Sequence, residues 1–266
     1  MSDADPGRPG TWDDLGRRTI SALVLGGLGL LAVWQGGVIF ALFVAVLVAV
    51  IFWEMGIMFG GHALRVALVG GATVLSFYVL PFLGGLVVAA LALALVALCL
   101  PVAARRSIVI PAALVLAAAA AILYFRETYG AGWMIWLGLV VVVSDVAAYF
   151  AGRKIGGPKF APRISPKKTW SGTGAGWLGA AVVGVLFTWL LPGPPRLIWL
   201  SVVVAFAGQM GDILESALKR RHGVKDSGGI MPGHGGLYDR FDSMIGAALA
   251  VAALSAAGMI QPGDAS

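Results

Sequence analysis

The segment LGGLVVAALALALVALCL, residues 83–100, contains eighteen consecutive residues without a single charged side chain. A run of this length can cross the hydrocarbon core of a bilayer, about 30 Å thick, as one α-helix, because about 20 helical residues suffice. Similar runs recur along the chain, in which 59% of the residues are hydrophobic and only 12% are charged, against about 25% charged in soluble domains. The sequence therefore predicts an all-α polytopic integral membrane protein.

Several runs are long and apolar enough to be membrane spans. They cover residues 19–36, 38–55, 64–81, 83–100, 108–125, 133–150, 173–191, 197–216 and 243–260. Glycines in the first three spans favour close helix packing, which in a bilayer depends on small residues rather than on a hydrophobic driving force. We expect about nine transmembrane helices and no separate soluble domain.

Basic residues are distributed asymmetrically between the loops that join these spans. If the N-terminus is cytoplasmic and the spans alternate, all of the 19 Lys and Arg residues except Arg126 and Arg196 lie on the cytoplasmic side. The positive-inside rule describes this asymmetry, so we expect a multi-pass protein of the cell (inner) membrane. The net charge of +6 then reflects cytoplasmic loops attracted to the anionic lipid bilayer, and no nucleic acid is expected as a partner.

Polar residues divide the chain into three regions. Residues 1–18 are rich in Pro, Gly and Asp and are predicted to be a flexible cytoplasmic tail. Residues 19–140 hold the N-terminal transmembrane helices. Residues 141–266 form the C-terminal region, whose cytoplasmic loops 151–172 and 217–242 are rich in glycine and charge. We therefore expect the catalytic part of the chain to be C-terminal.

The first polar motif of this region is SDVAAYFAGRKIGG, residues 144–157. Asp145 lies within or at the end of a predicted span, where an ionisable residue is costly and is by default a functional-site candidate. The alternative is a polar side chain that lines a helix contact or reaches the membrane interface. We favour the functional interpretation.

The second motif is RISPKKTWSGTGAG, residues 163–176. Its Ser-Pro dipeptide predicts a turn. Lys167 and Lys168 follow, and three glycines spaced by two then open the next span. A Gly-rich helix start offers free backbone N–H groups and the positive end of a helix dipole to a phosphate, although the order of a P-loop is absent. Alternatively, the lysines only determine the topology of the chain.

The third motif is GQMGDILESALKRR, residues 208–221. Asp212, Glu215 and Lys219 are spaced so that they share one helix face. Two carboxylates one turn apart on an apolar helix repel each other unless a cation lies nearby. That cation is either Lys219 in an internal ion pair or a hard metal such as Mg²⁺, which takes carboxylate, water and phosphate oxygens.

The fourth motif is KDSGGIMPGHGGLYDRFDS, residues 225–243. Asp239 and Asp242 are one turn apart at a predicted helix start. The glycines between them and Lys225 allow a tight backbone that approaches a ligand closely. His234 is interpreted as a phosphate donor or a solvated loop residue rather than a metal ligand, because the acidic surroundings favour Mg²⁺. Together the motifs indicate metal-assisted chemistry on a phosphorylated substrate.

Residues 216–242 also resemble the signature of the phosphatidate cytidylyltransferases, or CDP-diacylglycerol synthases. That pattern is Ser-x-Leu-Lys-Arg, four residues, Lys-Asp, then Pro-x-His-Gly-Gly and Asp-Arg-x-Asp. Here it is met by Ser216, Leu218, Lys219, Arg220, Lys225, Asp226, Gly228, His234, Gly235, Gly236, Asp239, Arg240 and Asp242.

The resemblance extends upstream over roughly the last 125 residues. A Ser-Asp-x-x-Ala-Tyr-x-x-Gly-Arg segment is matched from Ser144 to Arg153, and Ser-Pro-x-Lys-Thr from Ser165 to Thr169. Ser171 departs from the family, which has Glu or Gln there. The first 140 residues resemble the family only as hydrophobic spans.

This resemblance implies an enzyme that joins CTP and phosphatidic acid to give CDP-diacylglycerol and pyrophosphate, with Mg²⁺ as cofactor. The metal ligands that it implies are Asp212, Asp239 and Asp242, for one cation or two. The catalytic residues that it implies are Asp212, Asp239, Lys219, Asp226 and Asp242. The substrate-binding residues are Asp145, Arg153, Lys167, Lys168, Thr169, Arg220, Lys225, His234, Gly235, Gly236 and Arg240.

Two alternatives stay open at this point. One is a related nucleotidyltransferase or kinase that acts on an isoprenoid lipid, because the sequence does not specify the lipid chains. The other is an ion-coupled transporter with intramembrane carboxylates, which is disfavoured because no inverted repeat is evident and the charges gather on one membrane face. The sequence is compatible with a homodimer without specifying one.

Overall fold

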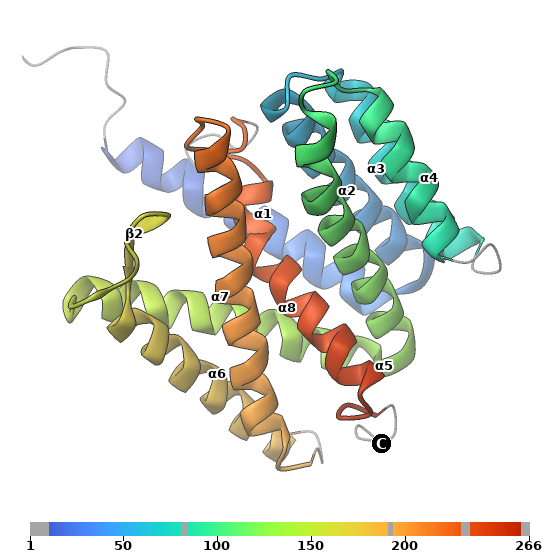
Figure 1. The fold of residues 1–266 in the computed structure, drawn as a ribbon. Coiled ribbons are helices and arrows are strands. Elements are labelled where there is room, and N and C mark those ends of the chain that lie inside the picture. Colours follow the sequence, from blue (N-terminus) through green and yellow to red (C-terminus); the bar gives the residue numbers. More distant parts are fainter. Residues whose placement is uncertain (1–10, 81–84, 191–193, 230–234, 262–266) are drawn as a thin grey trace, which may run out of the picture.

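A computed structural model describes residues 11–80, 85–190, 194–229 and 235–261. The elements are α1 (Thr11–Gln35), α2 (Gly37–Met58), α3 (Ala63–Val79), α4 (Gly85–Leu98), α5 (Arg105–Lys154), β1 (Lys159–Ala161), β2 (Ser165–Thr169), α6 (Trp170–Leu190), α7 (Leu197–Arg221) and α8 (Tyr238–Ala256). The helices form two groups joined by α5 (Figure 1).

The first group packs α2 against α3 and both against the first half of α5. Small residues permit this close packing, as expected for helices in a membrane. A Cβ atom on Gly70 of α3 would lie 2.5 Å from the ring of Phe52 on α2. Phe52 and Met55 of α2 are fully buried, so one face of α2 forms part of the core of this group.

The 50-residue helix α5 contains two of the predicted spans, 108–125 and 133–150. Its backbone is non-helical at Gly130, where φ is 82° and ψ is −177°, a conformation that residues with a side chain rarely adopt. The ribbon bends within this element, and its second half runs towards α6 and away from α2–α4 (Figure 1). The predicted loop between the two spans is therefore a kink.

The second group consists of the second half of α5 with α6, α7 and α8. The crossing of α7 and α8 is very close. A Cβ on Gly211 would lie 2.4 Å from the carbonyl oxygen of Asp242, and one on Gly246 would lie 2.2 Å from that of Ala207. This contact brings Asp212 and Glu215 of α7 near the first turns of α8.

The described residues are almost entirely helical, as expected, and β1 and β2 add one short antiparallel hairpin between α5 and α6. Its register pairs Lys159 with Thr169 and Ala161 with Ser165. The turn predicted at the Ser-Pro dipeptide is wrong, since Ser165 and Pro166 lie in β2 and the chain turns at 162–164. Proline is tolerated there because a two-stranded ribbon consists of edge strands.

Both predicted cytoplasmic loops are shorter than expected. Helix α5 continues to Lys154 and α6 begins at Trp170, while α7 continues to Arg221 and α8 begins at Tyr238. Lys219 and Asp239 are therefore helical residues with fixed backbones.

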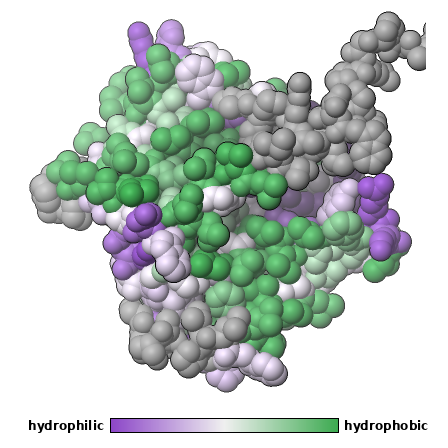
Figure 2. Space-filling model, turned by 180° about the vertical axis from the view of Figure 1, so that it is seen from behind, coloured by the Kyte–Doolittle hydropathy of each residue, from purple (hydrophilic) through white to green (hydrophobic). Residues whose placement is uncertain are grey.

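The outer surface is strongly apolar. Trp189, Leu178 and Leu31 are 85%, 71% and 64% exposed, and hydrophobic atoms cover much of the face in Figure 2. Within the described residues, four helices are long and apolar enough to cross a membrane: α2, α5, α6 and α7. These features fit a membrane protein, whereas the number of nine spans and the cytoplasmic N-terminus stay predictions.

Candidate functional site

A cavity of about 560 Å³ lies where the second half of α5, the hairpin, the middle of α7 and the starts of α6 and α8 meet. Several predicted site residues from separate motifs line it: Asp145, Arg153, Lys167, Lys168, Thr169, Asp212, Asp239, Arg240 and Asp242. The fold thus brings residues of all four sequence motifs to one place.

Other predicted residues lie outside the cavity wall. Arg220 is exposed and donates a hydrogen bond to the carbonyl of Val224, 3.3 Å away. Lys225 and Asp226 are exposed in the loop before α8. His234 lies outside the described residues, so its predicted phosphate contact stays a prediction.

Asp212 forms an ion pair across two elements. Its Oδ2 atom lies 2.6 Å from Nζ of Lys168 on β2, and both side chains are partly exposed. Ser216 Oγ donates to Asp212 Oδ1 at 3.4 Å. The sequence left Lys219 or a metal as the cation beside Asp212 and Glu215, and the structure pairs Asp212 with a lysine of the hairpin.

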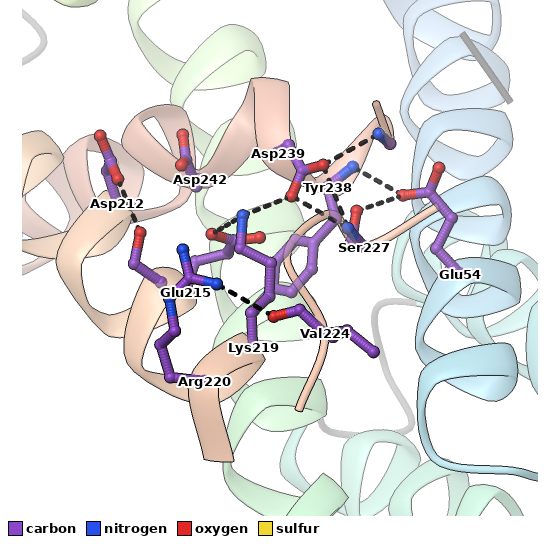
Figure 3. Close-up of polar contacts among 12 residues, drawn as sticks. Glu54, Asp212, Glu215, Lys219, Arg220, Val224, Ser227, Tyr238, Asp239 and Asp242 are labelled. Atoms are coloured by element: carbon purple, nitrogen blue, oxygen red, sulfur yellow. Dashed lines mark hydrogen bonds and ion pairs between the residues drawn. The ribbon is translucent and has the colours of Figure 1, made fainter. Parts of the chain in front are cut away.

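Lys219 lies between two other carboxylates. Its Nζ atom is 2.7 Å from Glu215 Oε2 and 2.7 Å from Asp239 Oδ1 (Figure 3). Lys219 and Glu215 are buried, at 8% and 3% exposure. The internal ion pair considered for Lys219 therefore exists with Glu215, and Lys219 joins α7 to α8 behind the cavity.

Asp239 is extensively hydrogen-bonded within the protein. Besides Lys219, its carboxylate accepts from the backbone N–H of Ser227 at 3.1 Å and from that of Gly236 at 2.9 Å. Burial alone would raise the pKa of Asp239, but the hydrogen bonds from Lys219 and Gly236 and the positive charge of Lys219 lower its pKa. Its metal ligation stays a prediction, and a cation there would share these oxygens with Lys219.

The remaining acidic residues of the cavity are candidates to hold a metal. Asp145 and Asp242 lie near enough to Asp212 for mutual repulsion, and Lys168 is the basic side chain that faces all three. Carboxylate oxygens are ligands suited to Mg²⁺. The donor chemistry therefore fits a divalent cation, although among the described residues no group of three acidic or imidazole side chains is already arranged to bind one.

Gly172 and Gly176, in the first two turns of α6, allow close packing of α6 against α5. A Cβ on Gly172 would lie 2.6 Å from the carbonyl oxygen of Ala148 on α5, and one on Gly176 would lie 3.0 Å from that of Ser144. Thr169 Oγ1 accepts from the N–H of Gly172 at 3.2 Å, which caps the start of α6. The predicted free N–H groups of this helix start are thus partly used by the protein.

The glycines of the fourth motif also contact the protein itself. A Cβ on Gly235 would lie 2.9 Å from Asp239 Oδ2, and one on Gly228 would lie 2.7 Å from Glu54 Oε1. The predicted close approach of this backbone is present, but its partners here are protein carboxylates. The direct phosphate contact predicted for Gly235 and Gly236 stays untested.

Glu54 on α2 is the residue that the sequence reasoning missed. It is 0% exposed, and its carboxylate accepts from the N–H of Leu237 at 2.8 Å and the N–H of Tyr238 at 2.9 Å. The sequence does mark Glu54, because it is the sole acidic residue of the predicted span 38–55. The rule applied to Asp145, that a carboxylate in a span is a functional candidate, applies to it equally.

Comparison with known proteins matches residues 16–257 to the family model described as "Cytidylyltransferase family". The chain belongs to this family. The match begins before α2, so the family pattern includes the N-terminal helices that the sequence reasoning treated only as hydrophobic spans. The resemblance inferred from the motifs is confirmed.

Individual curated relatives match about half of the length of this cytidylyltransferase family member. A phosphatidate cytidylyltransferase of Brucella suis is 45% identical over 124 residues, which is 46% of each chain. Proteins of the same name from Bacillus subtilis and Helicobacter pylori are 42% and 45% identical over 122 and 130 residues, or 45% and 48% of each chain. The matched segment spans about half the length of these relatives.

Proposed function

We propose that this protein transfers the cytidylyl group of CTP to phosphatidic acid, giving CDP-diacylglycerol and pyrophosphate. The cytidylyltransferase family match and the printed names of the relatives support this activity. The observation that carries the proposal is one cavity lined by two lysines, two arginines and several aspartates. Such a site suits a reaction between two phosphate-bearing substrates that is assisted by a bound cation.

The basic side chains of the cavity would hold the anionic substrates. Lys168 is anchored by Asp212 at 2.6 Å, and Arg153 donates to the hydroxyl of Tyr149 at 3.0 Å, so both charged groups have defined positions. Lys167 and Arg240 also line the wall. Charge-assisted hydrogen bonds from these groups would bind the triphosphate and the lipid phosphate and offset their mutual repulsion.

The proposed reaction is an in-line displacement at the α-phosphorus of CTP. An oxygen of the phosphatidate phosphate forms the new P–O bond, and the bond between the α-phosphorus and the bridging oxygen breaks to release pyrophosphate. Phosphate monoesters are largely ionised near neutral pH, so the nucleophile needs no protein base. Mg²⁺ bound by Asp212 with Asp242, Asp145 or Asp239 would supply further screening of the phosphate charges.

The apolar exterior supports a location in the bilayer. We propose the cell (inner) membrane, with the cavity at its cytoplasmic side, where CTP arrives from water and phosphatidic acid from the leaflet. Exposed Tyr149 and Trp170 lie near the cavity and the hairpin, and aromatic side chains of this kind favour the membrane interface.

The test is an assay of the purified protein in lipid nanodiscs with labelled CTP and Mg²⁺. Parallel reactions receive phosphatidic acid, an isoprenoid phosphate or no acceptor. We expect labelled CDP-diacylglycerol with phosphatidic acid and its loss with chelator. Labelling of the isoprenoid phosphate alone, or no transfer to either lipid, would refute the proposal.

A further inference from the structure

We propose that Glu54 of α2 is a positioning residue that holds the start of α8, and with it Asp242, at the cavity. This inference rests on the proposed function. It assigns a role to a helix of the N-terminal group, outside the motifs of the C-terminal region. Figure 3 shows the carboxylate of Glu54 directed from α2 at Ser227 and at the first residue of α8, Tyr238.

The first observation is that Glu54 is fully buried and that both of its carboxylate oxygens accept hydrogen bonds. Its Oε1 atom accepts from the N–H of Leu237 at 2.8 Å, and its Oε2 atom accepts from the N–H of Tyr238 at 2.9 Å. Oε2 also accepts from the hydroxyl of Ser227 at 3.1 Å. All three partners of Glu54 are hydrogen-bond donors, so both oxygens of its side chain must act as acceptors.

The second observation is that these N–H groups belong to the N-terminus of α8. Leu237 occupies the cap position and supplies no side-chain hydrogen bond, and the first N–H groups of a helix have no partner within the helix. Glu54 satisfies two of them from another element. Its negative charge also lies at the positive end of the helix dipole.

The third observation is a close fit between Glu54 and two glycines of the loop. A Cβ on Gly228 would lie 2.7 Å from Oε1, and a Cβ on Gly236 would lie 2.7 Å from Oε2 and 2.0 Å from Ser227 Oγ. Glycine at these positions is therefore explained by Glu54. Loop and carboxylate form one packed unit although they are more than 170 residues apart in sequence.

This unit is linked to the cavity through Asp239. The backbone N–H of Ser227 donates to Asp239 at 3.1 Å, while its hydroxyl donates to Glu54. Asp239 in turn binds Lys219 of α7 at 2.7 Å. Because Asp242 lies one turn further along α8 in the cavity wall, a shift at Glu54 would move it relative to the cations of α5 and β2.

Replacement by an isosteric amide isolates the effect of the carboxylate. In Glu54→Gln the side chain keeps one acceptor oxygen and gains an NH₂ donor, which would face a backbone N–H donor. We expect kcat to fall roughly 10- to 100-fold, because displacements of about 1 Å at a catalytic centre have effects of that size. KM for CTP should change less than kcat, since Lys167, Lys168 and Arg153 are not on α8 and only Arg240 of the basic cavity residues would move with it.

A second readout needs no substrate. Lys225 is exposed in the loop held by Glu54, so limited trypsin digestion at Lys225 should be faster in Glu54→Gln than in the parent protein. Glu54→Asp keeps the charge on a shorter side chain and should give intermediate values of kcat and cleavage rate. If Glu54→Gln does not fold, Glu54→Asp provides the comparison with the parent protein.

The matched control is Val48→Ala, a buried position two turns earlier on α2. It should lower the thermal unfolding temperature while keeping kcat and the protection of Lys225. Equal loss of kcat in Val48→Ala at an equal loss of thermal stability would overturn the inference, as would parent-like kcat and cleavage in both Glu54 variants. If the parent protein makes no CDP-diacylglycerol, the proposed function fails, while the digestion experiment still decides whether Glu54 holds the loop.

Discussion

Asp212 and Asp239 are both aspartates of the predicted metal set, but their surroundings differ. Asp212 is partly exposed and has a lysine from the hairpin as its main partner. Asp239 is bound by Lys219 and by two backbone N–H groups. Asp212 is therefore the more available ligand, whereas removal of Asp239 would also disturb the loop before α8.

Asp212→Asn should abolish most activity and leave the fold intact. We expect the rate to fall roughly 10²- to 10⁴-fold, because a bound cation supplies several kcal/mol of charge stabilisation. The partly exposed pair with Lys168 contributes only about 0–1 kcal/mol to stability. Rates at increasing Mg²⁺ concentration and thermal unfolding in detergent measure both effects.

Glu127→Gln is the control for this substitution. It makes the same change from acid to amide at an exposed residue that is absent from the wall of the cavity. Its carbonyl oxygen can still accept from the N–H of Gly37, 3.2 Å away in the parent. Turnover of Asp212→Asn equal to that of this control at saturating Mg²⁺ would contradict the metal role.

Lys168→Ala should weaken the use of CTP. A hydrogen bond to a charged group contributes about 1.5–3 kcal/mol, so kcat/KM should fall roughly 10- to 100-fold. Lys159→Ala removes the same charge from the same hairpin at an exposed residue that does not line the cavity. Initial-rate kinetics of both variants test this, and equal values would exclude a specific contact of Lys168 with substrate.

At the scale of elements, α5 connects the two helix groups through a single non-helical residue. Gly130 has a φ of 82°, and a Cβ added to it would meet no neighbouring atom within 4 Å. Its glycine is therefore required by backbone conformation and not by a neighbouring side chain. The kink directs the end of α5, with Asp145 and Arg153, towards α7 and β2.

Gly130→Ala should destabilise the protein by about 1–3 kcal/mol, the usual cost of a strained backbone conformation. Gly138→Ala is the matched control in the same helix, since no atom lies within 4 Å of the added Cβ and φ there is ordinary. That variant should be neutral or more stable, because alanine is the better helix former. Thermal unfolding measures the stability of both variants. Equal stabilities would show that the backbone at the kink does not require glycine.

At the scale of the whole molecule, the predicted topology places the hairpin and the loop before α8 on one membrane face. In a Cys99→Ser background, Lys159→Cys and Lys225→Cys should react with a membrane-impermeant thiol reagent from the cytoplasmic side. Glu127→Cys should react from the opposite side. Labelling of inverted and right-side-out vesicles tests this, and labelling of the two lysine positions from different sides would refute the shared face.

The sequence was sufficient for the class of protein and for much of the candidate site. Apolar runs of span length predict helices because a bilayer leaves the backbone no other partners, and each predicted span has a helical counterpart in the described residues. The motifs identified Asp145, Lys168, Asp212 and Asp242, which the fold brings to one cavity. The hairpin was missed because its five-residue strand Ser165–Thr169 has little apolar alternation.

The sequence by itself determined the membrane class, the charged motifs and the family, because hydrophobic run length and residue spacing are local properties of the chain. Only the tertiary structure decided which charges meet. Lys168 pairs with Asp212, Lys219 with Glu215 and Asp239, and Glu54 reaches a loop far away in sequence. A buried carboxylate must find donors, but the donors that it finds depend on how separate helices pack, which no spacing along the chain specifies.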